Sequence, residues 1–521
     1  MIVLIQKWLS GQAVCAGVAV AHLPLGCLVE NYRGEKEWNR VLSELRERGE
    51  VLELQEYAIK PVPDSENWGA NPLLRELTEI PAGEEAEGDW GEFGATWDKI
   101  WYGEKSYKYL YDESENLEDQ YAWRRGKERF EKWQSHLIDR YEPLIESKNE
   151  DPRKDLLKVL APLGSHLEKL EEGLQLPHAV LPNLWTDFSA IESAMDLTHP
   201  QSGYIQTATQ VAAFRSQVLL AGGKAEPAFR SLMVGLRFAE LADSGPFTID
   251  LLISDSCYRK CRLPLWMGLE KRSFSAGQLE MLQKQLEKRD FMTMVLRNLR
   301  AERALNIRGV EATFVDARKR EAAIRGGLGW VRELFPDMDV ETPLMILSLV
   351  PDGWIYQNFS RLVEWQDYFN VEPFASGDIA LIKKRLLEFS GFSSNLKTMP
   401  YTFLATGGAL HGKSFVKFFK TQVMIDQMII ACALERYFID KGAYPDSLSA
   451  LVPEYLDTEP EDRMASAPMR YLLTDDGRYR IYSVGWNQVD DGGVEFFGRA
   501  RRIEEEIDDW VWQYSPTAKS R

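Results

Sequence analysis

The chain has little cysteine and little histidine for its length, with 5 and 6 residues among 521. Cysteines this sparse exclude a disulfide framework, and no CxxC pair or zinc-ligand spacing appears. Cys257 and Cys261 lie four residues apart, where a bridge along one helix is strained, so we expect both to be small buried hydrophobic side chains. The absence of HExxH and GxSxG motifs excludes the common signatures of zinc proteases and serine hydrolases.

Basic side chains are also in the minority. The 62 Lys and Arg residues stand against 80 Asp and Glu residues, which gives a formal net charge of -18. A nucleic acid held by phosphate contacts needs a basic surface, so we expect no nucleic-acid partner. The most basic segment, 124–132, mixes both signs at helical spacing, which is typical of a solvated helix face.

No apolar run near the N-terminus reaches the ~20 residues that a membrane-spanning helix needs. The 16 residues from Ala13 to Leu28 are mostly apolar, but a His and a Pro interrupt them. We interpret residues 1–30 as an anchor or export segment, with signal-peptide cleavage at 19–21 or a lipid-modified Cys27 as variants. We therefore expect a protein of the cell envelope, anchored in the membrane or exported, with most of the chain outside the cytoplasm. The alternative is a buried hydrophobic helix of a cytoplasmic protein.

The chain is long enough for several cores, because 521 residues with 45% hydrophobic content exceed what one core organises. Composition divides it into five regions. They are the N-terminal apolar anchor or signal segment (1–30), a Trp-, Pro- and Gly-rich loop region packed on the body (31–116), a helical domain (117–398), a small α+β domain (399–500) and a charged tail (501–521).

The segment from Val51 to Glu118 mixes Pro, Gly, acidic residues and Trp without a regular period. It has too many aromatic residues for a disordered tether, so we expect them to pin the segment onto the helical body. The alternative is a carbohydrate-binding platform in a secreted carbohydrate-active protein. The aromatic residues concerned are Trp68, Trp90, Phe93, Trp97, Trp101 and Tyr102.

Helical periodicity continues from Leu117 to Leu396. We expect helices at 118–147, 152–173, 205–221, 226–243, 248–270, 275–289, 291–305, 315–334 and 376–390. Ser275 and Gln278 form a capping box at the start of one of them. Consecutive helices with short connections predict antiparallel hairpins, so the expected fold class is mainly α, an irregular helical bundle or a short helical-hairpin solenoid. Such bodies offer concave faces to protein partners.

Residues 407–414 satisfy the phosphate-loop pattern GxxxxGK(S/T). In this pattern Gly407 and Gly412 let backbone amides surround phosphates, Lys413 reaches the outer phosphates and the Ser414 hydroxyl binds magnesium. A strand at 401–406 would give the loop part of its usual context. No βαβ alternation and no magnesium-binding strand end follow, so the competing interpretation is that Lys413 and Ser414 simply open a helix.

The region from 414 onward combines a long helix with short strands. An apolar stripe predicts a helix at 414–439, Gly442 ends it, and Tyr444 and Pro445 turn the chain. A short helix is expected at 447–452. Strands are expected at 469–473, 479–484 and 494–497, with a hairpin turn at 475–477. The sequence thus predicts a small α+β domain.

This stretch resembles the globular head of the major pseudopilin of type II secretion. The resemblance covers about 414–498 and is carried by Arg436-Tyr437, Gly442, Tyr444-Pro445 and Ser483-Val484-Gly485. It implies a small antiparallel sheet packed across the helix, followed by an acidic calcium loop. The order of apolar segment, helical middle and this tail also resembles that of large uncharacterised bacterial envelope proteins.

Two departures from the pseudopilin pattern bear on function. A pseudopilin begins with a short basic leader, a cleavage Gly, then Phe and a Glu within one apolar helix, which this chain lacks, so we expect no pseudopilus. The calcium loop is kept in part, with Asn487, Asp490 and Asp491 as candidate oxygen ligands. The alternative is an Asp-Asp-Gly-Gly turn with solvated carboxylates. We expect no other cofactor.

These observations predict a non-enzymatic, membrane-associated or exported scaffold or interaction protein with protein partners. The N-terminus would carry the membrane association, and the C-terminal domain would be pseudopilin-like. The alternatives are a nucleotide-binding enzyme that uses the phosphate loop and a secreted carbohydrate-active protein.

Overall fold

The computed structural model of the chain describes residues 23–80, 86–101, 126–138, 145, 148–191, 200–315, 351–392, 412–493 and 509–514. It is mainly helical, with small antiparallel sheets near the C-terminus, which confirms the predicted mainly α class. Contacts group the chain into two compact units. The first comprises Met1–Ala58, Asp187–Thr198 and Val295–His411, and the second comprises Ile59–Thr186, His199–Met294 and Gly412–Arg521.

The first unit is built on long helices. They are α3 (Leu23–Glu47), α13 (Phe291–Val315), α16 (Asp352–Trp365), the π-helical turn η8 (Gln366–Val371), α17 (Glu372–Ser376) and α18 (Ile379–Phe392), with the short 3-10 helix η2 (Leu54–Tyr57). The first four residues of α13 belong to the second unit. Apolar side chains recur every three or four residues on α3 and face apolar residues of α13 and α16. The resulting core contains Trp38, Val41, Leu42, Leu45, Leu52, Ile307, Val310 and Val363.

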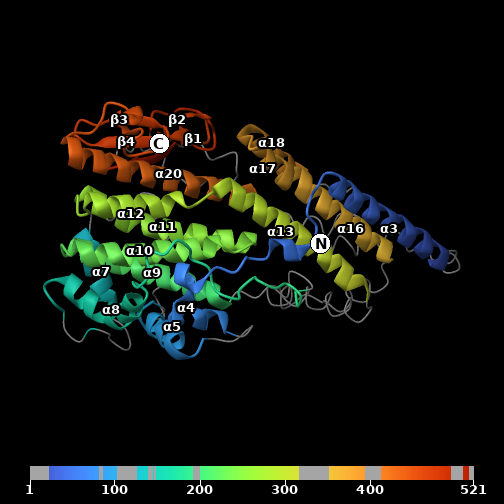
Figure 1. Ribbon diagram of the computed structural model, residues 1–521, viewed down its shortest axis with the longest axis horizontal. Coiled ribbons are helices and arrows are strands. Elements are labelled where there is room, and N and C mark those ends of the chain that lie inside the picture. Colours follow the sequence, from blue (N-terminus) through green and yellow to red (C-terminus); the bar gives the residue numbers. More distant parts are fainter. Residues whose placement is uncertain are drawn as a thin grey trace. The chain divides into compact units, whose positions relative to one another are not determined.

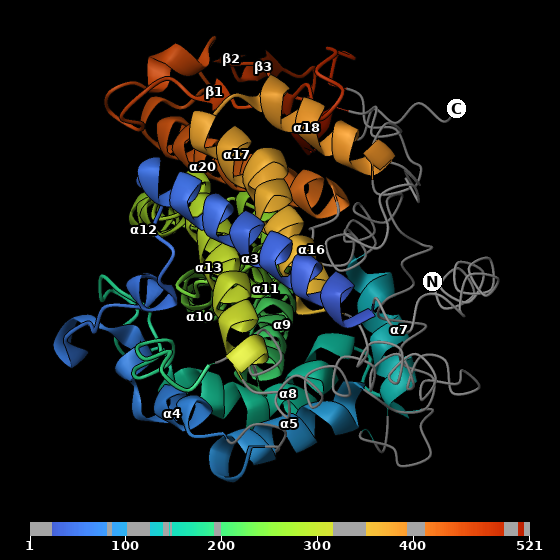
Figure 2. The ribbon, with the colours of Figure 1, turned by 90° about the vertical axis from the view of Figure 1, so that its right-hand side faces the viewer.

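Two glycines let α3 and α16 approach closely, as Figure 2 shows for the two ribbons. A Cβ atom added at Gly34 would lie 2.2 Å from the backbone oxygen of Gly353. One added at Gly353 would lie 1.8 Å from the backbone oxygen of Glu30. These backbones are therefore closer than any side chain permits, and both positions require glycine.

A buried ion network joins the loop after α3 to α13 and η8 in the first unit. Arg303, whose side chain is fully buried, donates to Asp367 at 2.6 Å and to Glu50 at 2.5 Å. Arg300 also pairs with Glu50, at 2.9 Å, and Arg48 pairs with Asp367. Burial acts to raise the pKa of Glu50, but the hydrogen bonds from Arg300 and Arg303 reverse this, so its pKa is lowered.

The second unit stacks helices in layers, which Figure 1 shows from α8 at one side to the C-terminal sheet at the other. Helix α8 packs on α9, α9 packs on α10 and α11, and α11 and α12 both pack on α20. The helices are α4 (Pro72–Arg75), α5 (Gly88–Trp101), α7 (Gly126–Ile138), α8 (Pro152–Lys169), α9 (Pro200–Ala221), α10 (Ala225–Asp243), α11 (Thr248–Glu270), α12 (Ala276–Glu287) and α20 (Gly412–Lys441). Short 3-10 helices are η3 (Asp64–Glu66), η4 (Trp68–Ala70), η5 (Glu76–Thr78) and η10 (Leu448–Leu451).

Local sequence signals explain several helix ends in this unit. The predicted capping box is present: the Ser275 hydroxyl accepts from the Gln278 amide at 3.3 Å, and Gln278 accepts from the Ser275 amide at 2.9 Å. Gly442 has a φ of 78° and ends α20, as its position in the sequence predicts. Cys257 and Cys261 are buried and form no disulfide, which also confirms the prediction.

The C-terminal domain (residues 412–514) carries two antiparallel sheets beside α20. One is the pair β1 (Glu461–Asp462) and β2 (Ala467–Pro468). The other has the order β3 (Arg470–Leu473), β4 (Tyr479–Ser483) and β5 (Trp510–Gln513). Strand β5 comes from the segment predicted to be a charged tail, and it is fully buried. The predicted third strand at 494–497 lies outside the described residues.

The prediction of a loop region at 31–116 is wrong in part, because this stretch contains most of α3, α4 and α5. Trp68, Trp90, Phe93 and Trp97 are all at most 3% exposed, and the indole nitrogens of Trp68 and Trp90 donate to backbone oxygens of Leu170 and Leu73. These aromatic residues therefore pin the segment onto helices of the second unit. Because their faces are buried, these four side chains cannot form a sugar-binding platform.

Candidate calcium loop in the C-terminal domain

The phosphate-loop residues lie at the start of α20, which begins at Gly412. Ser414 stands within this helix, and Gly407 and the predicted strand at 401–406 lie outside the described residues. Both sheets that the structure describes are antiparallel, whereas a phosphate loop follows a strand of a parallel sheet. No described contact supports the nucleotide-binding hypothesis, which stays a prediction.

The predicted calcium ligands lie in the loop that follows β4. This loop turns sharply, because Gln488, Gly492 and Gly493 have φ values of 62°, 79° and 69°. Two glycines in the left-handed region let the backbone fold back without the strain that larger residues would suffer. The loop thus gathers Asn487, Asp490 and Asp491 into one short segment.

Asp490 is already neutralised within the protein. Its Oδ2 accepts from the Arg470 Nε at 2.9 Å, and its Oδ1 accepts from the Tyr482 hydroxyl at 3.2 Å and the Gly492 amide at 3.0 Å. The hydrogen bond from Arg470 is the main reason that the pKa of Asp490 is lowered. Asp490 is therefore ionised, with donors on both oxygens.

Asn487 and Asp491 are half-buried and face each other. The Asn487 amide nitrogen donates to Asp491 Oδ2 at 3.2 Å, and the Asn487 side-chain oxygen accepts from the Val489 amide at 3.0 Å. These contacts hold the loop in shape.

A further carboxylate, Asp509, completes the site from outside the loop. Asp509 directly precedes β5, is 0% exposed, and accepts at Oδ2 from the Gly493 amide at 2.7 Å. Its Oδ1 is buried, and no hydrogen bond of normal geometry reaches it from the residues that the structure describes, although the Asp491 amide also acts on this carboxylate. Burial raises the pKa of Asp509 to about 6, the Gly493 and Asp491 amides oppose this rise, and the carboxylates of Asp491 and Asp490 add to it.

The donor set consists of oxygens, as calcium requires, but Asp490, Asp491 and Asp509 are not among the described side chains whose ligand atoms all lie within 4.8 Å of one another. A buried carboxylate oxygen without a partner is costly, and two nearby carboxylates raise that cost. A calcium ion, which takes six to eight oxygen ligands, would satisfy this oxygen and offset the repulsion. Asp509 and Asp491, whose charges act on each other, would hold it, whereas Arg470 already neutralises Asp490. The Asn487 oxygen accepts from the Val489 amide and would have to turn to join them.

The second polar cluster of this domain surrounds Glu435 on α20, which is 2% exposed. The Tyr444 and Tyr479 hydroxyls donate to its Oε1 at 2.8 and 3.3 Å, and Arg478 and Arg272 approach its carboxylate at 3.6 and 3.8 Å. The Tyr-Pro turn and β4 are thereby tied to α20. A carboxylate this enclosed is inaccessible to substrate, so the cluster is structural.

Sequence reasoning missed Asp509 and Glu435 for different reasons. Asp509 stands in an acidic stretch, and its signal was the apolar run Trp510 to Tyr514 that follows it and predicts a buried strand. Glu435 occupies an otherwise apolar helix face, where a lone acidic residue indicates a buried partner. Comparison with known proteins finds no family model, no curated protein and no solved structure that matches this chain.

Proposed function

We propose that the protein is a non-enzymatic, membrane-associated or exported scaffold or interaction protein, with a pseudopilin-like C-terminal domain and most of the chain outside the cytoplasm. The observation that carries this proposal is the acidic loop completed by Asp509, at the end of an antiparallel sheet that packs beside one long helix. Helix, Tyr-Pro turn, sheet and acidic loop follow one another in the order that the resemblance implies.

Packing within the domain supports this assignment. Gln427 of α20 donates to the backbone oxygen of Trp510 in β5 at 2.6 Å. The Tyr479 hydroxyl of β4 shares its one hydrogen between Glu435 Oε1 at 3.3 Å and the backbone oxygen of Ala431 at 3.4 Å, both on α20. The sheet is thus bonded to the helix through two of its strands. Tyr444, which belongs to the motif that carries the resemblance, reaches the same helix at Glu435.

The proposed calcium site serves structure rather than catalysis. Calcium would supply positive charge to the Asp491 and Asp509 carboxylates, and so order the loop between β4 and β5. Calcium of this kind is used by modules outside the cytoplasm, where its concentration is high enough for sites of moderate affinity. The loop therefore accords with an exported domain.

The start of α3 supports an N-terminal association with a membrane or with partner proteins. Leu28, Val29 and Tyr32 are 66%, 50% and 67% exposed, directly after the apolar N-terminal run. Their spacing places Leu28 and Tyr32 on one face of the helix, so an apolar stripe faces solvent. Among the helices in the described ranges, none is sufficiently long and apolar to cross a membrane.

The cellular location of the C-terminal domain tests the proposal. The full chain with a C-terminal tag is expressed in bacteria, spheroplasts are treated with protease, and the membranes are extracted with carbonate. We expect protease to digest the tag in intact spheroplasts, with the chain either in carbonate-resistant membranes or released from the periplasm. A cytoplasmic marker that stays intact is the control. A soluble tag protected until lysis would contradict the proposal and favour the cytoplasmic alternative.

A further inference from the structure

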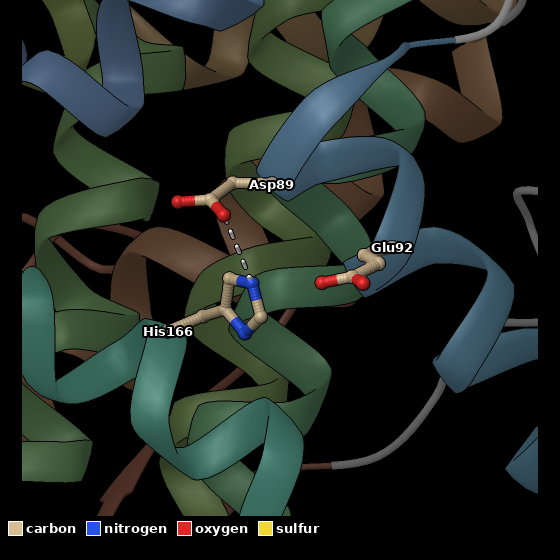
Figure 3. A group of neighbouring side chains, drawn as sticks. All are labelled: Asp89, Glu92 and His166. Atoms are coloured by element: carbon tan, nitrogen blue, oxygen red, sulfur yellow. Dashed lines mark ion pairs between the residues drawn. The ribbon is translucent and has the colours of Figure 1, made fainter.

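A second group of metal-binding side chains lies in the second unit, far along the chain from the acidic loop. Asp89 and Glu92 stand three residues apart on α5 and so share one helix face, and His166 projects from α8, which packs on α5. Figure 3 shows the His166 ring directed toward the two carboxylates. One potential ligand atom from each residue lies within 4.8 Å of the other two.

The hydrogen bonds of His166 define which ring nitrogen is available. Its Nδ1 lies 3.0 Å from the backbone oxygen of Pro162, and since a carbonyl only accepts, Nδ1 carries the hydrogen. Nε2 is buried and has no hydrogen-bond partner among the residues that the structure describes, and the side chain as a whole is 13% exposed. Metal-binding histidines show this arrangement, with one nitrogen bonded to a carbonyl and the other directed at the ion.

Asp89 lies opposite this nitrogen, at a distance that leaves room for an ion. Its Oδ1 is 3.8 Å from His166 Nε2, too far for a hydrogen bond. Two ligands of one zinc ion, with bonds of about 2.0–2.2 Å, lie about 3–3.5 Å apart. A shift of less than about 1 Å therefore brings both atoms to a common metal ion.

Glu76 is a further carboxylate near this group of side chains. Its Oε2 is buried and has no hydrogen-bond partner. Its carboxylate interacts electrostatically with Asp89 and His166. Two buried polar atoms without partners, one on Glu76 and one on His166, thus lie beside the same aspartate.

Lys169 is the one charged donor that an ion would have to tolerate. Its Nζ donates to Asp89 Oδ2 at 2.7 Å, and the lysine side chain is 54% exposed. This bond occupies the oxygen that faces away from His166 and leaves Oδ1 directed at it.

We propose that Asp89, Glu92 and His166 bind a divalent transition-metal ion, with Zn²⁺ the best match. One imidazole and two carboxylates suit a borderline ion such as zinc, and three protein ligands leave a coordination position for water or a partner's side chain. The charge of Glu76 acts on Asp89. The inference goes beyond the proposed function and is independent of the calcium loop.

Zinc titration of the metal-free full-length chain tests the proposal. The chain is stripped with a chelator and titrated with ZnCl₂ in a calorimeter, in the presence of millimolar Ca²⁺ to saturate the oxygen-ligated loop. We expect one equivalent of Zn²⁺ whose binding is weakened about ten-fold or more by His166→Gln and by Glu92→Gln. His178→Gln, at an exposed histidine, is the matched control and leaves the affinity unchanged.

Two further measurements distinguish loss of a zinc ligand from loss of the fold and from competition by Lys169. Lys169→Gln removes the competing ammonium group, so we expect it to retain or tighten zinc binding. Glu92 is exposed, so Glu92→Gln keeps the melting temperature of the metal-free chain and distinguishes ligand loss from unfolding. A wild-type chain that takes up no Zn²⁺, or a His166→Gln chain that binds it equally well, would overturn the proposal and leave His166 as a partner of Asp89 alone.

Discussion

Glu435 links α20 to the Tyr-Pro turn and to β4 through hydrogen bonds, although burial of its carboxylate is unfavourable. Its carboxylate accepts from two tyrosine hydroxyls, yet it lies in the core between α20 and the sheet. Burial raises its pKa, and the hydrogen bonds from Tyr444 and Tyr479 and the charges of Arg478 and Arg272 only partly offset the rise. The folded state therefore holds a proton on Glu435 more tightly than the unfolded state does.

This linkage predicts a pH dependence. The pKa of Glu435 is higher in the folded chain than in the unfolded chain. The free energy of unfolding therefore falls as the pH rises from the unfolded-state pKa of Glu435 through its folded-state pKa. Glu435→Gln keeps an oxygen that can accept from the tyrosines and cannot ionise, so the variant should lose this part of the pH dependence. Urea denaturation from about pH 4 to pH 7 measures it.

Two variants make the test specific. Glu435→Leu leaves the Tyr444 and Tyr479 hydroxyls without their acceptor and should lower the free energy of unfolding by about 2 kcal/mol or more. Glu459→Gln, at an exposed glutamate of the same domain, should change neither the free energy of unfolding nor its dependence on pH. Equal pH slopes for wild type and Glu435→Gln would show that Glu435 does not carry the linkage.

At the scale of elements, the contact of α3 with α16 depends on glycine rather than on complementary side chains. The backbone oxygen of Gly353 lies 2.2 Å from the position of a Cβ atom at residue 34. A methyl group there forces the helices apart, because backbone atoms cannot move aside as a flexible side chain can. The helices then lose part of the packing around Trp38 and Val363.

We predict that Gly34→Ala destabilises the first unit by about 1–3 kcal/mol. Amide hydrogen exchange, read by mass spectrometry on peptides from α3 and α16, should be faster in the variant. Gly277→Ala is the control, since no atom lies within 4 Å of its added Cβ and alanine favours a helix by about 1 kcal/mol. Unchanged exchange in α3 of Gly34→Ala would mean that the helices do not need their close approach.

The bounds of several helices could be predicted from the sequence. Helices α8 to α12 and α20 were predicted within a few residues, because their apolar positions recur regularly and their ends carry caps or glycines. Helix α5 was missed because three glycines, at 88, 91 and 94, lower its helix propensity. It forms because Trp90, Phe93 and Trp97, spaced by three and four residues, bury one face in the second unit.

At the scale of the whole molecule, each unit is assembled from three separate stretches of chain. Composition divides a sequence only into consecutive regions, whereas contacts between distant stretches depend on packing that no local pattern records. For the same reason, the local sequence pattern does not identify Asp509 as part of the candidate calcium site. The sequence indicates the loop around Asp490 and Asp491, but Asp509 joins it only through the pairing of β4 with β5.

Calcium binding by the full chain tests the central claim most directly, that the C-terminal domain carries a cation loop completed by Asp509. Calorimetric titration with CaCl₂ should give one site with a Kd on the order of 0.1 mM, as in modules outside the cytoplasm. Asp509→Asn and Asp491→Asn should weaken binding about ten-fold or more, while Asp475→Asn, in the exposed hairpin turn, should leave it unchanged. A wild-type chain that binds no calcium, or an Asp509→Asn chain with the same affinity, would contradict the account.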